Sequence, residues 1–394
     1  MAYRILSLDG GGAWALIEVQ ALIALHGGGT KGHAVLSQYD FVAANSGGSL
    51  VLGGLIEDMT LDELRNFFMD EAKRRSIFSP SRSWRDRLLR AVTGLGPKYS
   101  AEAKRLAIER LLPRTGGTLM NGIANGIIGA GGAPVHVLIV GFNYDRNLAT
   151  FFRSAPAGGP AWGDGAPANV SLAHAIHAST NAPVNYFDGP ALCPGTHGRY
   201  WDGGITGCNN PVLAAVTEAI TLGRDPQQLA ALSLGTGTVR LPLAQPGQPS
   251  SPYLANPSAP GLLPDLRKLA TSILDDPPDA ATFIAHAMTG GLVGVPIPAQ
   301  SRIVRMNPMI SPVLTAGGTW TAPSGMTEAQ FVFLRDLDMD GIEQSAVTAI
   351  SRLADLWLAD KVANQPIRGD GATMQPEIGY GHCSEAMQAW HIVR

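Results

Sequence analysis

A short apolar strand pattern, Phe41–Ala44, and an apolar helical pattern, Leu50–Ile56, are separated by only five residues. Ser46 therefore falls on a tight strand-to-helix turn, where its side chain is held in a forced backbone conformation at a helix N-terminus. Gly47 and Gly48 supply the small neighbours that this close approach of strand and helix requires. The turn favours negative charge near the Ser46 hydroxyl, although a serine beside glycines also occurs as an ordinary turn or helix cap.

A second junction of this kind lies near the N-terminus. The strand pattern Tyr3–Leu8 runs into Asp9 and three consecutive glycines, and a helical pattern follows over residues 13–25. The glycines are Gly10, Gly11 and Gly12. Backbone N–H groups with no side chains in the way bind anions. The loop therefore suits the negatively charged oxygen that forms when Ser46 attacks an ester.

The same glycines also match a dinucleotide fingerprint, Gly10-x-Gly12-x-x-Ala15. That interpretation requires an acidic residue at the end of the second strand, about 20 residues further on. The candidate, Asp40, instead stands at the start of the second strand. The oxyanion interpretation requires a serine on the next strand-to-helix turn, and Ser46 is there, so we favour it.

Asp202 stands before Gly203 and Gly204, in a turn that precedes the sequence Asn-Asn-Pro at 209–211 and a further helical pattern. An Asp-Gly turn is common on its own. In combination with a nucleophile at Ser46, Asp202 becomes the candidate general base.

Several segments of the chain, taken in order, resemble the patatin-like phospholipase family. These segments are Asp9–Gly12, Asn45–Gly48, Ala178–Pro183 with Tyr186 and Phe187, Asp202–Gly204 with residues 209–211, and Ala231–Thr238. Five motifs in the family's order over residues 3–238 are hard to obtain by chance. The stretch beyond residue 238 carries no such motif.

The resemblance implies an α/β fold, a three-layer sandwich with a mostly parallel central sheet flanked by helices. It also implies a Ser–Asp dyad that cleaves acyl esters of phospholipids or lysophospholipids. Residue by residue, Ser46 would be the nucleophile and Asp202 the base, with the amides of Gly10, Gly11 and Gly12 as the oxyanion hole. An aspartate is a weak base at its ordinary pKa of about 4, so we expect burial to raise the pKa of Asp202.

Three positions depart from the family's usual pattern. Ala44, before Asn45, replaces the first glycine of the turn, and Ala15 replaces another glycine. Each alanine adds a methyl group where strand and helix approach closely. Trp14 stands where a basic residue is common, and it either helps to hold an acyl chain or packs into the core.

Composition excludes several classes of protein. A hydrophobic content of 45% with 15% charged residues is typical of a folded chain, and a net charge of −3 gives no general attraction to DNA or RNA. Three irregularly spaced cysteines suit a reducing compartment better than a disulfide scaffold. The N-terminus enters the first strand pattern without signal-peptide features. We therefore expect a cytoplasmic protein, at most peripheral at the inner membrane face.

Basic residues gather between Lys73 and Arg114, where twelve lysines and arginines face only three acidic residues. The run is either a solvated helical face or a surface for an anionic partner, such as lipid headgroups or a nucleotide. An uncharged, glycine-rich stretch over 115–133 follows it. We expect the two together, about residues 73–133, to form a cap over the site.

We expect a catalytic core over residues 1–240, and a loop-rich, helical C-terminal region over 241–394 packed on it. An uncharged stretch over 241–264, rich in Pro, Gly and Ser, predicts a long loop at this boundary. A long amphipathic helix or helix pair is predicted over 327–360.

No metal or cofactor is expected. His174 and His177 lie three apart on a predicted helix, without a third ligand at a suitable spacing, and we interpret them as structural. The stretch 336–341 imitates the start of a calcium loop, but Val347 stands where a bidentate glutamate is required.

Three functions remain compatible with the sequence. The first is the acyl hydrolase, and the second is the same enzyme activated by a cyclic nucleotide, as in bacterial patatin-like proteins that degrade membranes in defence against phage. The basic run and the C-terminal third would house that control, although no nucleotide-binding motif is present. The third is a dinucleotide-dependent oxidoreductase that uses the turn 10–12, or a non-catalytic binder with the same fold.

Overall fold

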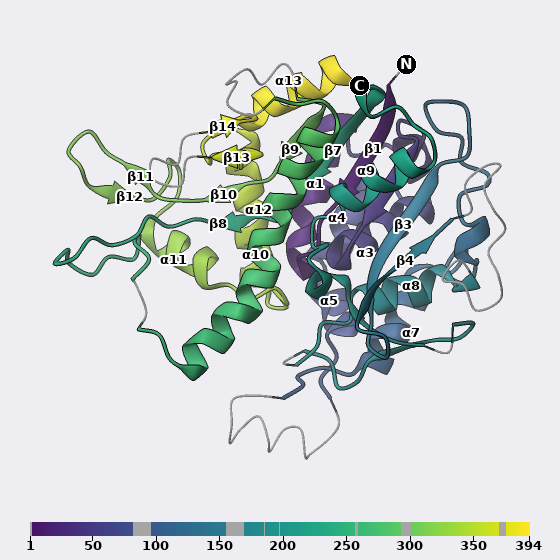
Figure 1. The fold of residues 1–394 in the computed structure, drawn as a ribbon. Coiled ribbons are helices and arrows are strands. Elements are labelled where there is room, and N and C mark those ends of the chain that lie inside the picture. The colour runs from purple at the N-terminus through teal and green to yellow at the C-terminus, as the bar shows by residue number, and fades with distance from the viewer. Residues whose placement is uncertain are drawn as a thin grey trace.

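The computed structural model describes residues 2–81, 96–154, 169–256, 259–292, 301–369 and 376–394, except 185 and 197. In these residues eight strands form one sheet, in the order β5-β6-β3-β2-β1-β7-β9, with β4 paired to β3. Its strands are β1 (Tyr3–Leu8), β2 (Phe41–Ala44), β3 (His136–Asn143), β4 (Leu148–Arg153), β5 (Ala191–Cys193), β6 (Gly198–Asp202), β7 (Leu229–Leu234) and β9 (Ile303–Met306). Figure 1 shows this sheet in the middle of the molecule, with helices on both sides.

Five successive strands, β3, β2, β1, β7 and the edge strand β9, are all parallel, whereas β4, β5 and β6 are antiparallel to their neighbours. Leu8 pairs with both Ala44 and Leu234, so β1, β2 and β7 end at the same edge of the sheet. The loops that follow parallel strands at this edge are the usual place for a ligand or active site. Both predicted strand-to-helix turns begin here.

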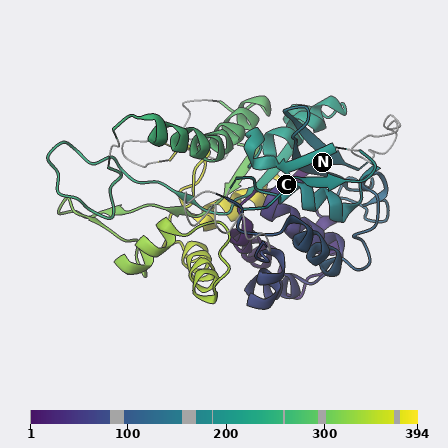
Figure 2. The ribbon, with the colours of Figure 1, turned by 90° about the horizontal axis from the view of Figure 1, so that it is seen from below.

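Alternate side chains of the strands enter two separate cores, as the period of a strand requires. Leu6 and Val42 pack into the core on one face, and Ile5 and Phe41 pack into the core on the other. Figure 2 shows the two helical layers on opposite sides of the sheet, with α9 and α10 forming one of them. The predicted α/β sandwich is therefore confirmed.

The helices run through the whole chain. They are α1 (Leu16–His26), α2 (Gly32–Leu36), α3 (Ser46–Ile56), α4 (Leu61–Met69), α5 (Glu71–Ile77), α7 (Ala101–Leu111), α8 (Leu172–Ser179), α9 (Val212–Thr221), α10 (Leu262–Met288), α11 (Glu328–Asp336), α12 (Gln344–Leu358) and α13 (Cys383–Val393). No helix in the described ranges is long and apolar enough to cross a lipid bilayer.

The C-terminal part is helical, as expected, but it also contributes to the sheet. Its strand β9 pairs with β7, so the sheet continues across the boundary predicted near residue 240. Short two-stranded ladders lie outside the sheet: β8 (Thr238–Val239) with β10 (Met309–Ile310), β11 (Val313–Leu314) with β12 (Trp320–Thr321), and β13 (Arg368–Gly369) with β14 (Pro376–Ile378). The predicted helix pair is confirmed as α11 and α12, and the division into two regions remains a prediction.

Candidate active site

Ser46 lies between β2 and α3, as the sequence predicts, but the helix begins at Ser46 itself rather than near Leu50. Its φ of 45° lies in the left-handed region, which costs free energy in a residue other than glycine. Two hydrogen bonds hold this turn in place. The N–H of Ser46 donates to Ser179 Oγ at 2.9 Å, and Ser49 Oγ donates to the carbonyl of Ser46 at 2.6 Å.

Gly47 and Gly48 allow α3 to approach the N-terminal loop closely. A Cβ atom on Gly47 would lie 2.6 Å from the carbonyl oxygen of Gly12, and one on Gly48 would lie 2.6 Å from that of Asp9. Atoms of a larger side chain cannot occupy such short distances. The two glycines are therefore required by the packing of the turn, as predicted.

Asp202 reaches Ser46 from the end of β6. Ser46 Oγ donates a hydrogen bond of 2.5 Å to Asp202 Oδ2, across a separation of 156 positions in the chain. The other carboxylate oxygen accepts the N–H of Gly204 at 2.8 Å and Nδ2 of Asn45 at 3.4 Å. Gly203 permits this arrangement, because a Cβ atom there would lie 2.4 Å from Asn45 Oδ1. The predicted nucleophile and base are thus in direct contact.

The environment of Asp202 acts on its pKa in two directions. Burial raises the pKa of this carboxyl above its usual value. The hydrogen bonds from Ser46 and Gly204, and the positive charge of Lys104, oppose that rise. The net effect is a carboxylate more basic than an exposed aspartate.

Lys104, on α7, is fully buried beneath the site. Its Nζ donates to the carbonyl of His177 at 3.0 Å and to Asn181 Oδ1 at 2.9 Å, and lies 4.0 Å from the centroid of the Phe187 ring. Burial lowers the pKa of Lys104 well below its usual value, while the negative charge of Asp202 acts in the opposite direction. Asn181 also accepts the backbone N–H of Asp202 at 2.9 Å, so it connects the lysine to the base.

The three predicted oxyanion glycines are not equivalent. The N–H of Gly10 donates to the carbonyl of Asn209 at 2.8 Å, so, contrary to the prediction, it is not available to an oxyanion here. The amides of Gly11 and Gly12 have no hydrogen-bond partner among the described residues. The next amide, of Ala13, donates to the carbonyl of Met339 at 3.0 Å.

Behind this loop, Asp9 forms a buried ion pair with Arg305 of β9, with Asp9 Oδ2 and the guanidinium 2.6 Å apart. Arg305 also donates to Ser233 Oγ at 2.8 Å, and the N–H of Asp9 donates to Glu18 Oε1 at 2.6 Å. Burial raises the pKa of Asp9 to about 6, against the effect of Arg305. A residue beyond position 240 therefore supports the loop next to Ser46.

The cavity beside Ser46 is small, with a volume of about 20 Å³. A cavity of that size holds about one water molecule, so an acyl chain cannot enter without movement of the walls. Apolar and aromatic side chains dominate the lining, which consists of Gly12, Ser46, Gly47, Leu50, Ile77, Phe78, Thr180, Ala182, Tyr186, Phe187, Asp202 and Met339.

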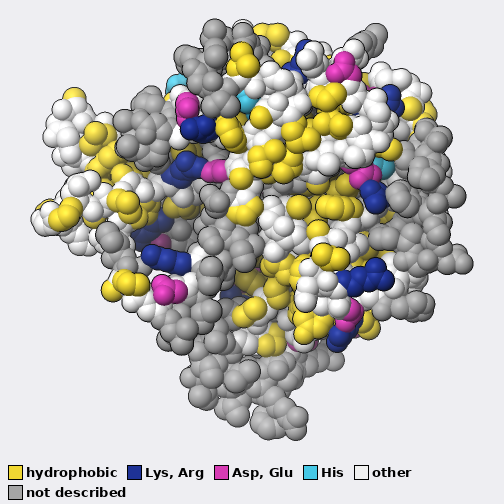
Figure 3. Space-filling model, viewed as in Figure 1, with side chains coloured by type: hydrophobic (Ala, Val, Ile, Leu, Met, Phe, Trp, Pro, Cys, Tyr) yellow, Lys and Arg dark blue, Asp and Glu magenta, His cyan; other side chains and the backbone are white. Residues whose placement is uncertain are grey.

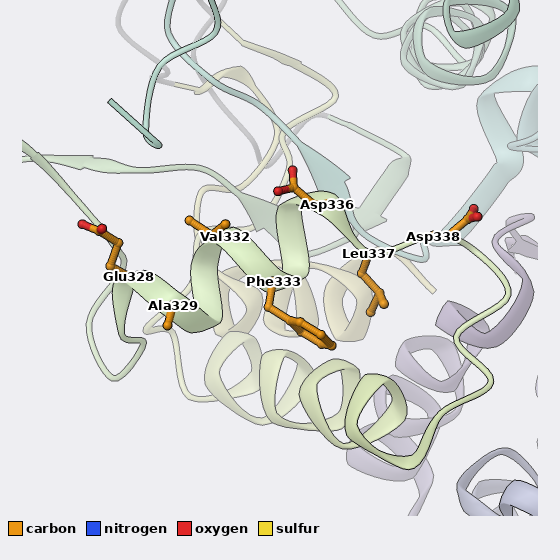
Figure 4. A pocket seen from close by; sticks show the side chains of 7 residues that line it. All are labelled: Glu328, Ala329, Val332, Phe333, Asp336, Leu337 and Asp338. Carbon is orange, nitrogen blue, oxygen red and sulfur yellow. The ribbon is translucent and has the colours of Figure 1, made fainter. Parts of the chain in front are cut away.

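A roomier pocket of about 600 Å³ lies elsewhere, along the outer side of α11. Figure 4 shows its side chains, from Glu328 at one end to Leu337 and Asp338 at the other. Ser46 and Asp202 are not part of it. This pocket is therefore separate from the pair Ser46 and Asp202.

The two stretches predicted to form a cap lie at different ends of the sheet. Ile77 and Phe78, from the basic run, do border Ser46. Gly131, from the glycine-rich stretch, instead donates its N–H to Asp40 Oδ1 at 2.5 Å, at the amino end of β2 and thus at the opposite edge of the sheet. Residues 82–95 of the basic run lie outside the described ranges.

Asp40 also accepts the N–H of Arg4 at 2.8 Å, which fixes it at the edge away from the turn 10–12. It is therefore not placed to bind a ribose there, and the dinucleotide interpretation lacks its acidic residue.

His174 and His177 both lie on α8, and in the described residues no hydrogen bond joins either ring to Ser46. No group of three or more His, Cys, Asp or Glu side chains in those residues is arranged to hold a metal.

Lys104, Arg305 and Met339 belong to the surroundings of Ser46, although the sequence analysis gave them no role there. Lys104 was part of a basic run, and a charge run does not reveal which member is buried. The alternating aspartates around Met339 were conspicuous only as an imitation of a calcium loop.

Trp14 is buried, packs into the core and donates from Nε1 to the carbonyl of Asp338 at 3.3 Å.

A family model for patatin-like phospholipases matches residues 6–216. No curated protein matches the chain. Among solved structures, VipD from Legionella pneumophila is 12% identical, over 89% of this chain and 66% of VipD, with a TM-score of 0.33. Human GIVD cytosolic phospholipase A2 is 20% identical, over 39% of this chain and 21% of its own, with a TM-score of 0.23. The chain thus spans less than two thirds of either protein, and neither likeness carries weight at these TM-scores.

The family match covers more than half of the chain, from the first strand of the sheet to helix α9. It includes the glycine loop at 10–12, the turn at Ser46 and the aspartate at 202. A match of this extent, which includes the segments that the fold brings to one edge of the sheet, shows that the chain belongs to the patatin-like phospholipase family.

Proposed function

We propose that this chain hydrolyses fatty-acyl ester bonds of phospholipids or lysophospholipids, with Ser46 as nucleophile and Asp202 as general base. The observation that carries the proposal is the hydrogen bond of 2.5 Å between Ser46 Oγ and Asp202 Oδ2. Both side chains are buried, with an exposure of 7% each, so bulk water does not compete for this contact. The raised pKa of Asp202 makes it a better base toward an alcohol than an ordinary aspartate.

This geometry supports the following reaction. Asp202 accepts the Ser46 proton while Oγ attacks the ester carbonyl carbon, and the carbonyl oxygen becomes an oxyanion near the amides of Gly11 and Gly12. When the intermediate collapses, Asp202 passes the proton to the oxygen of the departing alcohol. Water then gives a proton to Asp202, attacks the acyl group on Ser46 and releases the fatty acid, and the proton returns to Ser46.

The apolar lining of the cavity supports a substrate with an acyl chain. Leu50, Ile77 and Phe187 offer no hydrogen bonds to a polar substrate at this point of the wall. Figure 3 shows apolar side chains spread over one face of the molecule, with basic and acidic side chains between them. That face carries no single sign of charge, and the lipid headgroup contact must be sought closer to the site.

Fatty-acid release from a short-chain phospholipid, measured by mass spectrometry, tests the proposed function. We expect Ser46→Ala and Asp202→Asn each to lower turnover at least about a thousandfold, as for residues that act as one catalytic unit. Ser37→Ala and Asp62→Asn, at positions away from the site, serve as matched controls and should retain activity. Undiminished turnover in Ser46→Ala would refute the assignment.

No nucleotide-binding site is identified in the described ranges. Activation by a nucleotide, in defence against phage, is therefore not part of the proposed function. Thermal unfolding in the presence of cyclic nucleotides would reveal such a ligand as a rise in Tm.

A further inference from the structure

The segment 337–343, between α11 and α12, enters the candidate active site from the far end of the chain. Its middle residue, Met339, lines the same cavity as Ser46. The carbonyl oxygen of Met339 accepts the Ala13 N–H at 3.0 Å, directly after the glycine loop. The Ala13 N–H lies where a donor to the carbonyl of a bound ester would be expected, and it is bound by a main-chain carbonyl instead.

The residues on either side of Met339 are aspartates. Lys98 contacts both of them, and each also accepts a hydrogen bond from one tyrosine. Asp338 contacts Lys98 Nζ at 3.0 Å and accepts a hydrogen bond from the Tyr186 hydroxyl. Asp340 accepts from the Tyr99 hydroxyl at 2.5 Å and lies 3.4 Å from Lys98 Nζ. The three side chains present only donors to these carboxylates, so the site they form selects for negative charge.

The anion-binding site, Lys98, Tyr99 and Tyr186, is built by parts of the chain other than the segment that fills it. The backbone N–H groups of Lys98 and Tyr99 both donate to the carbonyl of Tyr186, at 2.9 and 2.7 Å. Phe78 packs on the Tyr99 ring, with the ring centroids 5.2 Å apart. Tyr186 also borders the cavity of Ser46, so the anion-binding site adjoins the reacting groups.

The order of groups in the segment is carboxylate, carbonyl, carboxylate. A glycerophospholipid likewise combines an ester carbonyl with a negatively charged group, because its single phosphate lies a few bonds from that carbonyl. We propose that Lys98, Tyr99 and Tyr186 bind the phosphate of the phospholipid substrate, and that Asp338–Asp340 occupies the site as a pseudosubstrate while it is closed. This inference rests on the proposed function.

The closed state is held by contacts that a substrate can replace. The side chain of Lys98 is 31% exposed and that of Asp338 is 47% exposed, and ion pairs with this much solvent contribute little to stability. A phosphate offers the same donors more acceptor oxygens than a carboxylate does. Its binding would release the segment and free the Ala13 N–H for the oxyanion.

The test uses two short-chain substrates that differ only in the phosphate, dioctanoylphosphatidic acid and dioctanoylglycerol. In the full-length chain, Asp338→Asn with Asp340→Asn should speed hydrolysis of dioctanoylglycerol severalfold, because the closed state loses its ion pairs. The quantity compared is the ratio of kcat/KM for dioctanoylphosphatidic acid to kcat/KM for dioctanoylglycerol. Adding Lys98→Met should lower this ratio about tenfold, as expected for the loss of one charge-assisted hydrogen bond. Lys73→Met, at an exposed position on α5, is the matched control and should leave the ratio unchanged.

Tyr186→Phe removes a single hydroxyl and should lower the same ratio in the same direction, which keeps the test valid if Lys98→Met folds poorly. A ratio unaffected by both substitutions overturns the phosphate site while the proposed function stands. If neither substitution changes the ratio, but inorganic phosphate alters dioctanoylglycerol turnover in a way that depends on Lys98, the site binds free phosphate. That result also overturns the proposed site for the lipid phosphate. Absence of fatty-acid release from either substrate in every variant instead refutes the proposed function.

Discussion

Asp202 combines two properties that a base without a histidine partner needs. Burial raises its pKa, and this makes the carboxylate a stronger base. Hydrogen bonds from Ser46, Gly204 and Asn45, together with the charge of Lys104, oppose this rise. The balance between these effects sets the pH range in which the proposed dyad works.

Lys104→Met should move the acid limb of the pH–rate profile to higher pH. The active form of Asp202 is deprotonated, so activity is lost as the pH falls through its pKa. Removing the positive charge of Lys104 leaves the effect of burial less opposed and raises that pKa further. The measurement is kcat/KM for a short-chain ester between acidic and neutral pH, with Lys104→Arg as the variant that keeps the charge.

An acid limb that stays in place in Lys104→Met, in protein shown to be folded by its thermal transition, would contradict the electrostatic role of this lysine. It would leave Lys104 as a packing residue beneath Asn181.

Ser46 and Asp202 could be predicted because each carries a local signature, a strand-to-helix turn and an Asp-Gly-Gly turn. Lys104 and Met339 carry none. Lys104 meets Asn181 77 positions away, and Met339 meets Ala13 from the other end of the chain. Contacts of that kind arise only when the sheet and its helices have been assembled, so no pattern in the neighbouring residues marks them.

The first turn of α3 depends on glycine more than the elements around it do. Gly48 donates its N–H to the carbonyl of Asp9 at 3.0 Å, and a Cβ atom would lie 2.6 Å from the carbonyl of Leu8 as well. Those carbonyl groups belong to β1 and the glycine loop and cannot move aside without disturbing the sheet.

Gly48→Ala should therefore lower the free energy of unfolding by about 1–3 kcal/mol, the usual cost of an overpacked contact. Gly117→Ala is the matched control, because a Cβ atom there would meet nothing within 4 Å. Urea unfolding of both variants gives the comparison. Equal stability of the two would show that the turn relaxes more easily than its distances suggest.

Elements with strong patterns were predicted well, and elements with ambiguous composition were not. The strands Tyr3–Leu8 and Phe41–Ala44 were placed correctly from their apolar runs before a turn. The stretch 115–133 was expected over Ser46, but glycine content indicates backbone freedom and not which edge of a sheet a loop follows. Of the two forms predicted over 327–360, the helix pair is the one observed. Residues 337–343 separate α11 from α12, where Gly341 adopts a φ of 43° and the preceding aspartates bind Lys98.

The whole chain, rather than the matched part alone, builds the candidate site. Strand β9 extends the sheet beyond residue 240, and Arg305 on it pairs with Asp9 beneath the glycine loop. Met339, from the same C-terminal third, lines the cavity beside Ser46. Sequence motifs could not reveal this dependence, because they end near residue 238 and the later contacts are long-range.

The location of a covalent adduct would test the assignment of nucleophile and base together. After treatment with a fluorophosphonate, peptide mass spectrometry should find one modified residue, Ser46, and no adduct in Ser46→Ala. Labelling should be strongly slowed in Asp202→Asn, because the serine then lacks its base. An adduct on a different residue, or labelling of Asp202→Asn at the wild-type rate, would contradict the proposed dyad.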